Sequence, residues 1–335
     1  MRIEENFEEV AGFLFIGDPH AARANPGRRC DDYQASVLGK LREASGLAHL
    51  MELKPVILGD LIHRKDESSV ALTTELFTTL KGFPSTPVEL DGNHGKMSKV
   101  PSLGDVEHHL AVVGAIQLVS TPGLVGRYRM AGQVVELYGT PHEYPIPRSL
   151  VEYGADLSVH RRRILITHHD MAFGGAYPGA AALHEIEGCD VLVNGHMHRT
   201  APSVVKGQTT LHCPGNIEPV SHEEIDHQPA VWRWAPELGS DLEPHYLAHT
   251  RDVFNLTGLE VVAGDSGTAV RELIRSEFVD LMKGDEALSA TRTDEAAILK
   301  EDVEDVILTS QVSDPAAALL RSILQEVSDK SAQSV

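Results

Sequence analysis

Short apolar runs recur along the first two-thirds of the chain, and polar residues follow directly where most of them end. Five of these runs are short and mostly apolar, which is typical of buried strands: residues 13–17, 55–58, 87–90, 163–167 and 191–195. Further strands are predicted at 116–120, 133–138, 209–213, 230–234 and 245–249. Apolar positions at helical spacing predict helices over 33–50, capped by Asp31 or Asp32, and near 68–80.

The ends of the five buried strands carry side chains that could perform chemistry. The residues at these ends are Asp18, His20, Asp60, Asn93, His94, His168, His169, His196 and His198. His196 and His198 lie two residues apart, so in extended backbone both imidazoles point to the same side. Either His168 or His169 could be the ligand from its strand, and we choose His168 because it follows the strand directly.

Composition indicates a soluble globular protein, because 42% of the 335 residues are hydrophobic and 23% are charged. No apolar run is long enough to span a membrane, so no membrane partner is expected. Cys30, Cys189 and Cys213 are few and far apart, which indicates reduced thiols in a cytoplasmic protein. The net charge of −20 opposes nonspecific binding to polyanions. A nucleic-acid substrate would therefore have to be met by metals, a local basic patch or a partner.

The residues at the strand ends offer oxygen and imidazole donors and no thiolate. This mixture favours a pair of divalent ions, Mn²⁺ first, with Fe²⁺ or Mg²⁺ as alternatives, over a structural zinc. Two neighbouring cations repel each other, so a shared anion is expected, and Asp60 stands alone at its strand end. With neutral Asn93 and several neutral imidazoles, such a centre stays net positive. It could hold a phosphate oxygen and acidify a bound water.

The order and spacing of these residues resemble the calcineurin-like metallophosphoesterases, whose blocks D-x-H, G-D, G-N-H, H and G-H-x-H cover roughly residues 13–199 here. The resemblance implies an α/β fold, a four-layer α/β/β/α sandwich. It implies one metal held by Asp18, His20, Asp60 and His198. The other would be held by Asp60, Asn93, His168 and His196. His94 would be the general acid for the leaving oxygen, since an imidazole titrates near neutral pH.

Within this family the chain is similar to the nuclease subunit of DNA double-strand-break processing complexes, the SbcD type, and to its bacteriophage counterparts. The features shared with that type are His63 after Asp60, the arginine-rich loop that follows His20, and the stretch from Cys213 to Asn216. The resemblance makes His63 a second catalytic candidate, with a surface histidine at a helix start as the alternative. Arg23, Arg28 and Arg29 are weaker substrate-binding candidates, with a solvated loop as the alternative.

The resemblance also divides the chain into three parts. Residues 1–218 would form the nuclease domain, residues 219–262 a small capping region that contacts DNA, and residues 263–335 a helical acidic tail. Between Arg271 and Val335 the chain has seven basic and fourteen acidic residues. The tail would dock on an SMC-like ATPase with a long coiled coil, and a homodimer is implied as well.

Two positions depart from the family pattern. The acidic residue that usually follows the Asn-His pair is replaced by Gly95, which leaves His94 less well held or held by another partner. Asn216 stands where a serine is common. Neither change removes a predicted metal ligand.

Three hypotheses for function follow. The first is a metal-dependent DNA exonuclease and endonuclease that acts in repair or recombination in a bacterial or phage-infected cell. The second is a small-molecule phosphodiesterase or phosphoprotein phosphatase on the same metal centre, which would not need the acidic tail. The third is an assembly protein without activity that keeps the metal site for structure.

Overall fold

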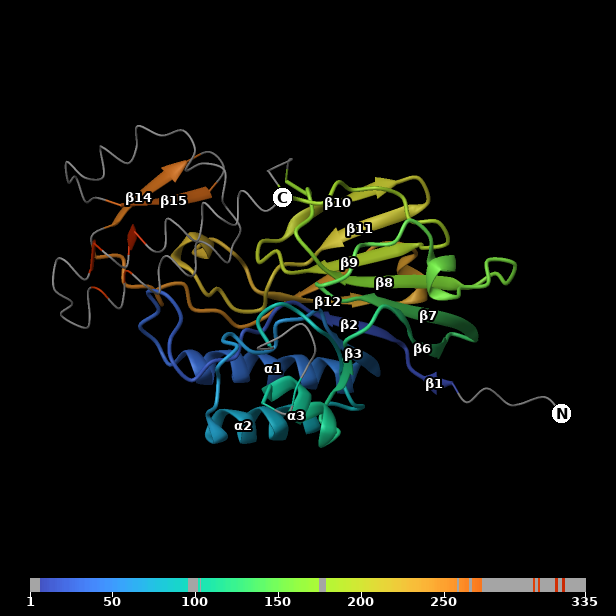
Figure 1. Ribbon diagram of the computed structural model, residues 1–335, viewed down its shortest axis with the longest axis horizontal. Helices are drawn as coiled ribbons and strands as arrows, with labels where there is room; N and C mark the ends of the chain where they lie inside the picture. Colours follow the sequence, from blue (N-terminus) through green and yellow to red (C-terminus); the bar gives the residue numbers. More distant parts are fainter. Residues whose placement is uncertain are drawn as a thin grey trace.

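Two β-sheets and three α-helices form the framework of the protein, as the computed structural model shows (Figure 1). The structure describes residues 7–95, 102, 104–174, 179–257, 259–264, 267–272, 304, 307, 317, 318, 321 and 322. The seven-stranded sheet has the order β1 (Glu8–Glu9), β6 (Gly123–Met130), β7 (Gln133–Thr140), β8 (Arg162–His168), β9 (Val191–Gly195), β11 (Thr209–Cys213), β10 (Ala201–Lys206). The six-stranded sheet has the order β13 (Glu243–Tyr246), β12 (Ala230–Trp234), β2 (Gly12–Ile16), β3 (Leu53–Ile57), β4 (Val88–Leu90), β5 (Gln117–Val119).

Most strands that precede predicted site residues run parallel to one another. In one sheet β2, β3, β4 and β5 are parallel, and in the other β7, β8, β9 and β11 are parallel. Parallel strands present their carboxyl ends at the same edge of a sheet, which is where α/β proteins commonly build their sites. The two sheets stack on each other, so their carboxyl edges can contribute to one site (Figure 1).

The apolar core occupies three layers. Phe13, Phe15 and Trp234 meet Ile164 and Val193 in the space between the two sheets. Helices α1 (Tyr33–Leu50), α2 (Val70–Lys81) and α3 (Val106–Val112) lie together over the outer face of the six-stranded sheet (Figure 1). The outer face of the seven-stranded sheet is covered by the short 3₁₀ helix η1 (Leu150–Tyr153) and by irregular segments. The predicted α/β sandwich of two sheets flanked by helices is confirmed.

Local sequence signals account for the helices that were predicted. Helix α1 has the predicted bounds, and the Asp32 side chain accepts a hydrogen bond from the backbone N–H of Ala35, as an N-cap should. Helix α2 begins after Ser69, which caps it in the same way. Helix α3 and strands β1, β6 and β10 were not predicted from the pattern. None of the described helices is long and apolar enough to cross a membrane.

Part of the region assigned to a capping domain extends the sandwich. Strand β12 pairs antiparallel with β2, and β13 pairs with β12, so residues 230–246 belong to the six-stranded sheet. The predicted helical tail begins instead with a hairpin of β14 (Leu259–Gly264) and β15 (Gly267–Glu272). Residues 304, 307, 317, 318, 321 and 322 are helical. The rest of the predicted tail lies outside the described residues, and a separate capping domain stays a prediction.

A buried ion-pair network, and not a phosphate site, holds Arg29. Its guanidinium lies 2.5 Å from Glu218 and 2.6 Å from Asp31. The other oxygen of Glu218 lies 2.5 Å from the Lys40 ammonium on α1. Arg29 and Lys40 are almost fully buried and Glu218 is completely buried. The prediction that Arg29 binds substrate is therefore wrong, because two carboxylates already occupy its donors.

Removing Glu218 should destabilise the fold strongly. In Glu218→Ala, Lys40 loses its buried carboxylate and Arg29 loses one of its two carboxylate partners, and breaking a buried pair in this way costs about 3–5 kcal/mol. The measurement is the free energy of unfolding in urea. The matched control is Glu75→Ala, which breaks the exposed pair with Arg42 and should cost about 0–1 kcal/mol. Equal losses in the two variants would contradict a structural role for Glu218.

Candidate metal centre

The carboxyl ends of five strands bring the predicted ligands to one place. Asp18 and His20 follow β2, Asp60 follows β3, and Asn93 follows β4. His168 is the last residue of β8, and His196 and His198 follow β9. All of these side chains are at least largely buried except Asn93, which is partly exposed.

One group of donors consists of Asp18, His20 and His198. One donor atom from each lies within 4.8 Å of the others. The Nε2 atoms of His20 and His198 are only 2.9 Å apart. The other ring nitrogen of His198, Nδ1, lies 2.8 Å from a carboxylate oxygen of Glu224. His198 therefore presents Nε2 to the group.

A second group consists of Asp60, Asn93, His168 and His196. The Nε2 atom of His168 lies 3.0 Å from Oδ2 of Asp60 and 3.1 Å from Oδ1 of Asn93. The Nδ1 atom of His196 lies 3.1 Å from the same Asn93 oxygen. Asp60 also lies 3.8 Å from His20 of the first group, so it stands between the two groups. This is the position expected of a shared ligand.

Buried polar atoms in the first group lack partners. Both carboxylate oxygens of Asp18 and Nδ1 of His20 have no hydrogen-bond partner among the described residues. Leaving such atoms unpaired in the interior is costly. A divalent cation would satisfy the Asp18 carboxylate and the facing imidazoles together, so the residues present fit a metal.

Mutual attraction and burial set the protonation of the centre. Burial raises the pKa of Asp18 above its ordinary value, against the attraction of His168. Burial also opposes ionisation of Asp60, but His168 and His94 hold the pKa of Asp60 well below its ordinary value. Burial would lower the pKa of His168, yet Asp60 and Asp18 raise it to about 9. Without metal, His168 is therefore protonated at neutral pH.

The backbone of the centre is strained. Asp18, His20, Asp60 and His196 have positive φ angles of 24°, 47°, 47° and 69°. The described part of the chain has only two further non-glycine residues with positive φ. Such conformations cost on the order of 1–3 kcal/mol each and concentrate at functional sites. With unstrained backbone angles at these positions, the four predicted ligands would lie elsewhere.

Gly195 allows the strands to approach each other at the centre. A Cβ atom at this position would lie 2.5 Å from the carbonyl oxygen of Leu58 and 2.8 Å from Oδ1 of Asp18. Any side chain would therefore collide with the predicted ligand Asp18 and with the neighbouring strand end. The glycine before His196 is therefore required by space.

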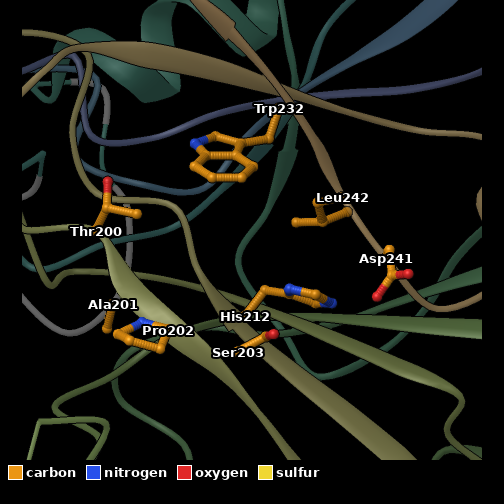
Figure 2. A pocket seen from close by; sticks show the side chains of 8 residues that line it. All are labelled: Thr200, Ala201, Pro202, Ser203, His212, Trp232, Asp241 and Leu242. Carbon is orange, nitrogen blue, oxygen red and sulfur yellow. The ribbon is translucent and has the colours of Figure 1, made fainter.

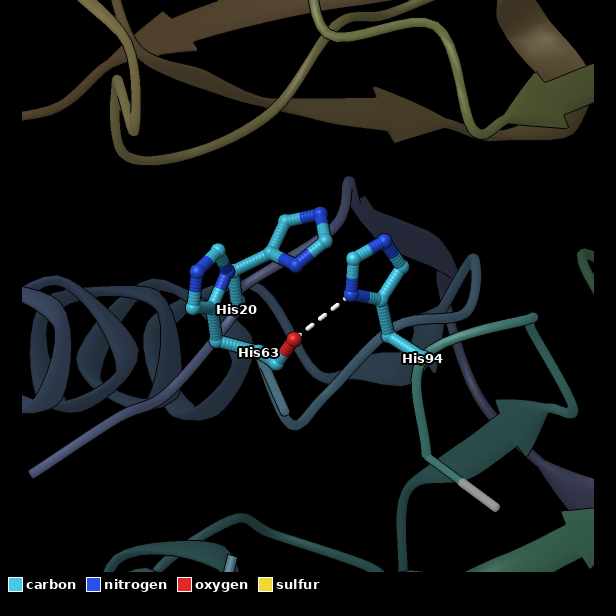
Figure 3. A group of neighbouring side chains, drawn as sticks. All are labelled: His20, His63 and His94. Atoms are coloured by element: carbon cyan, nitrogen blue, oxygen red, sulfur yellow. Dashed lines mark hydrogen bonds between the residues drawn. The ribbon is translucent and has the colours of Figure 1, made fainter. Parts of the chain in front are cut away.

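Two further histidines lie beside the first group (Figure 3). The ring centroids of His63 and His94 are 5.4 Å and 4.8 Å from that of His20. The Nδ1 atom of His94 lies 2.5 Å from the backbone carbonyl oxygen of His63, so this N–H donates to the carbonyl. Of the two alternatives left open by Gly95, His94 is therefore held by another partner.

A carboxyl group from α3 occupies the space beside Gly95. A Cβ atom at position 95 would lie 1.8 Å from Oε2 of Glu107, which is almost fully buried. Glu107 also lies 3.4 Å from the backbone N–H of Ile62, in the loop that carries His63. Burial, together with repulsion from Asp60, raises the pKa of Glu107 to about 8. A carboxyl group is therefore present here, but it comes from a helix that the sequence pattern did not predict.

The remaining candidates, His169, Arg23 and Arg28, lie outside the two donor groups. His169 turns away from the second group, and its Nε2 lies 2.7 Å from the carbonyl oxygen of Tyr144. Arg23 is exposed, and Arg28 donates to the carbonyl oxygen of Thr257. A cavity of about 670 Å³ opens between β10, β11 and β12, and none of the predicted ligands lines it (Figure 2).

Sequence reasoning missed three polar neighbours of the centre. The ring of His142, just after β7, lies 5.3 Å from that of His196. Asp170 lies 3.3 Å from Nε2 of His196, and Glu224 binds His198. His142 follows a strand end as the ligands do, so the same signal could have found it. Glu224 lies in the 3₁₀ helix η2 (His222–Glu224), and no local pattern marks it.

The sequence model of one protein family, described as calcineurin-like phosphoesterase, matches residues 12–200. The chain belongs to this family. It is accordingly a hydrolase of phosphoester bonds, and the donor groups of the metal centre lie within the matched residues. A comparison with curated protein sequences finds no match.

Two solved structures from Thermus thermophilus are similar to the chain. A hypothetical protein is 11% identical, with 70% of this chain and 98% of that chain covered and a TM-score of 0.40. A 5'-nucleotidase precursor is 10% identical, with 84% of this chain and 60% of that chain covered and a TM-score of 0.42. At these TM-scores neither likeness bears on the substrate of this chain.

Metal binding should release protons. His168 carries a proton at neutral pH because its pKa is about 9, and Nε2 can bind a cation only after that proton leaves. We expect Mn²⁺ binding at neutral pH to release about one proton per protein. Release should decline as the pH rises through about 9. The measurement is the calorimetric binding enthalpy in buffers of different ionisation enthalpy, and an identical enthalpy in all buffers would contradict the prediction.

Proposed function

We propose that this chain is the nuclease subunit of a DNA end-processing complex, which hydrolyses DNA phosphodiesters with two divalent ions, Mn²⁺ in the first place. The observation that carries the proposal is the His63–His94 contact beside the candidate metal centre. Cleavage of a DNA phosphodiester needs one group to protonate the leaving oxygen. Here a second histidine, His63, lies in the same wall of the site. It follows Ile62 in the chain, and the backbone N–H of Ile62 contacts Glu107.

His94 is suited to act as the general acid. Its Nδ1–H donates to the His63 carbonyl, which fixes the ring. In the protonated imidazolium form, Nε2–H could then give its proton to the leaving oxygen, which leaves a neutral ring with Nδ1–H in place. The residues that would hold the metals are Asp18, His20, Asp60, Asn93, His168, His196 and His198. Bound metals would supply Lewis-acid stabilisation of the phosphate charge and activation of water.

His63 has a different role from His94. Burial, reinforced by the neighbouring His94, lowers the pKa of His63 to about 3, so its imidazole is neutral at physiological pH. A neutral imidazole cannot act as a strong proton donor. We assign His63 to holding His94 through its carbonyl and to forming the wall of the site next to the scissile bond.

The DNA duplex would be bound mainly by a partner. The net charge of −20 disfavours a solitary DNA-binding protein, and with Arg29 buried only Arg23 and Arg28 of the loop remain near the surface. Arg23 lies next to the His63 loop, because its backbone N–H donates to Glu67. The proposed partner is a coiled-coil SMC-like ATPase that docks on the acidic tail, in a cytoplasmic complex that includes a second copy of this chain.

Removing His94 should abolish nuclease activity without removing the metals. Purified protein with Mn²⁺ should degrade linear DNA from its ends or nick single strands. His94→Ala should be slower by about 10²- to 10⁴-fold, the usual contribution of a positioned general acid. His109→Ala, an exposed histidine of α3, is the matched control. The defect should be smaller on bis(4-nitrophenyl) phosphate, since nitrophenolate leaves without a proton.

Other outcomes would point to the competing hypotheses. Hydrolysis of small phosphoesters alone, under every metal condition, would favour the small-molecule phosphodiesterase. Tight Mn²⁺ binding without turnover of any phosphodiester would favour the assembly protein. An equal defect of His94→Ala on DNA and on the nitrophenyl ester would contradict the general-acid role.

A further inference from the structure

Two carboxylates that are not predicted ligands contact the two histidines after β9. An oxygen of Glu224 lies 2.8 Å from Nδ1 of His198, while Nε2 of that ring faces His20. An oxygen of Asp170 lies 3.3 Å from Nε2 of His196, while Nδ1 of that ring faces Asn93. The two histidines therefore present opposite ring nitrogens to their donor groups, each with a carboxylate behind it.

The Glu224 carboxylate is held rigidly. The side chain is almost fully buried, and its second oxygen accepts hydrogen bonds from the Asn216 side-chain amide and the Val220 backbone N–H, both at 2.9 Å. The backbone N–H of Asn216 in turn donates to the carbonyl oxygen of His198 at 2.9 Å. Asn216, whose departure from the family pattern had no evident consequence in the sequence, thus ties Glu224 to the ligand loop.

An imidazole has one proton to place on two nitrogens when it is neutral. Because Glu224 can only accept at Oε1, the proton of His198 belongs on Nδ1 and the lone pair is left on Nε2. A carboxylate on the far side of a ligand histidine fixes its tautomer and ring orientation and makes it a better donor to metal.

We propose that Glu224 is a positioning residue that selects Nε2 of His198 as a metal ligand, and that Asp170 selects Nδ1 of His196 in the same way. This inference rests on the proposed two-metal centre. It assigns Glu224 and Asp170 to different metals, although their histidines are only two residues apart. It also ties residues 216–224 to the centre, although they lie beyond the residues that match the family.

The test is Glu224→Gln in the full chain. Two N–H groups donate to Oε2 of Glu224 in the wild type. In Glu224→Gln the side-chain oxygen must therefore take the position of Oε2, and the side-chain NH₂ must face His198. Nδ1 of His198 then becomes an acceptor, and its proton moves to Nε2. We expect one of two Mn²⁺ ions to bind about 10- to 100-fold more weakly and the other to be unchanged, as measured by calorimetric titration.

Asp170→Asn is the matched variant for the other metal. Each variant should weaken the same ion as the alanine variant of its own histidine, so Glu224→Gln should resemble His198→Ala and Asp170→Asn should resemble His196→Ala. Two ions bound by Glu224→Gln with wild-type affinity would overturn the proposal. So would the loss of both ions together, because a merely structural defect would not discriminate between the metals.

A second readout does not depend on metal. In ¹⁵N spectra of the metal-free protein labelled at histidine, the His198 signal should show the Nδ1–H tautomer in the wild type and Nε2–H in Glu224→Gln. An unchanged tautomer would overturn the proposal. If Glu224→Gln does not fold, Glu224→Asp is the alternative variant, because it keeps the negative charge on a shorter side chain. Weaker binding of one Mn²⁺ ion alone would support the proposal, and wild-type affinity for both ions would overturn it. A wild-type protein that binds two ions but leaves DNA intact would refute the nuclease proposal alone.

Discussion

Burial of Asp18 and Asp60 at the carboxyl edge of the sandwich is costly, because both carboxylates lie where almost no water reaches them. The surrounding imidazoles are the groups that offset this cost. His168 shares its proton with Asp60, and the attraction between them changes the pKa of both. Asp18 has no such hydrogen bond among the described residues. The buried Asp18 carboxylate therefore needs another group to offset its burial, and a bound cation would be such a group.

The geometry of the centre follows from this constraint. The predicted ligands come from two stacked sheets and converge within hydrogen-bond distance, with positive φ angles at four of them and a glycine at position 195. Groups behind the ligands then hold each ring: the Leu58 carbonyl oxygen for His168, at 2.8 Å, and carboxylates for the histidines after β9. Backbone strain and the outer contacts thus act on the same side chains, the predicted metal ligands, and both limit where their donor atoms can lie.

The sequence was informative where the chemistry is local. In each of these motifs the strand, the turn and the predicted ligand lie within a few residues of one another. The sequence alone could therefore place Asp18, Asp60, Asn93 and His196 at the carboxyl edge of the sheets. Contacts between distant segments could not be predicted in this way. Nothing near Arg29 marks it as the partner of Glu218, and nothing near Gly95 shows that a carboxyl group from α3 fills its space. The pairing of β12 with β2 likewise joins residues as distant in the chain as Phe15 and Trp232.

That pairing determines where a functional fragment of this protein can end. All of the ligand motifs, and the residues matched by the family, are complete by residue 200. A polypeptide cut there would nevertheless leave β2 as an exposed sheet edge, without Trp234 in the core between the sheets. It would also lack Glu218 beneath α1 and Glu224 behind His198. A fragment that keeps these contacts therefore reaches at least to Trp234, well past the last ligand motif.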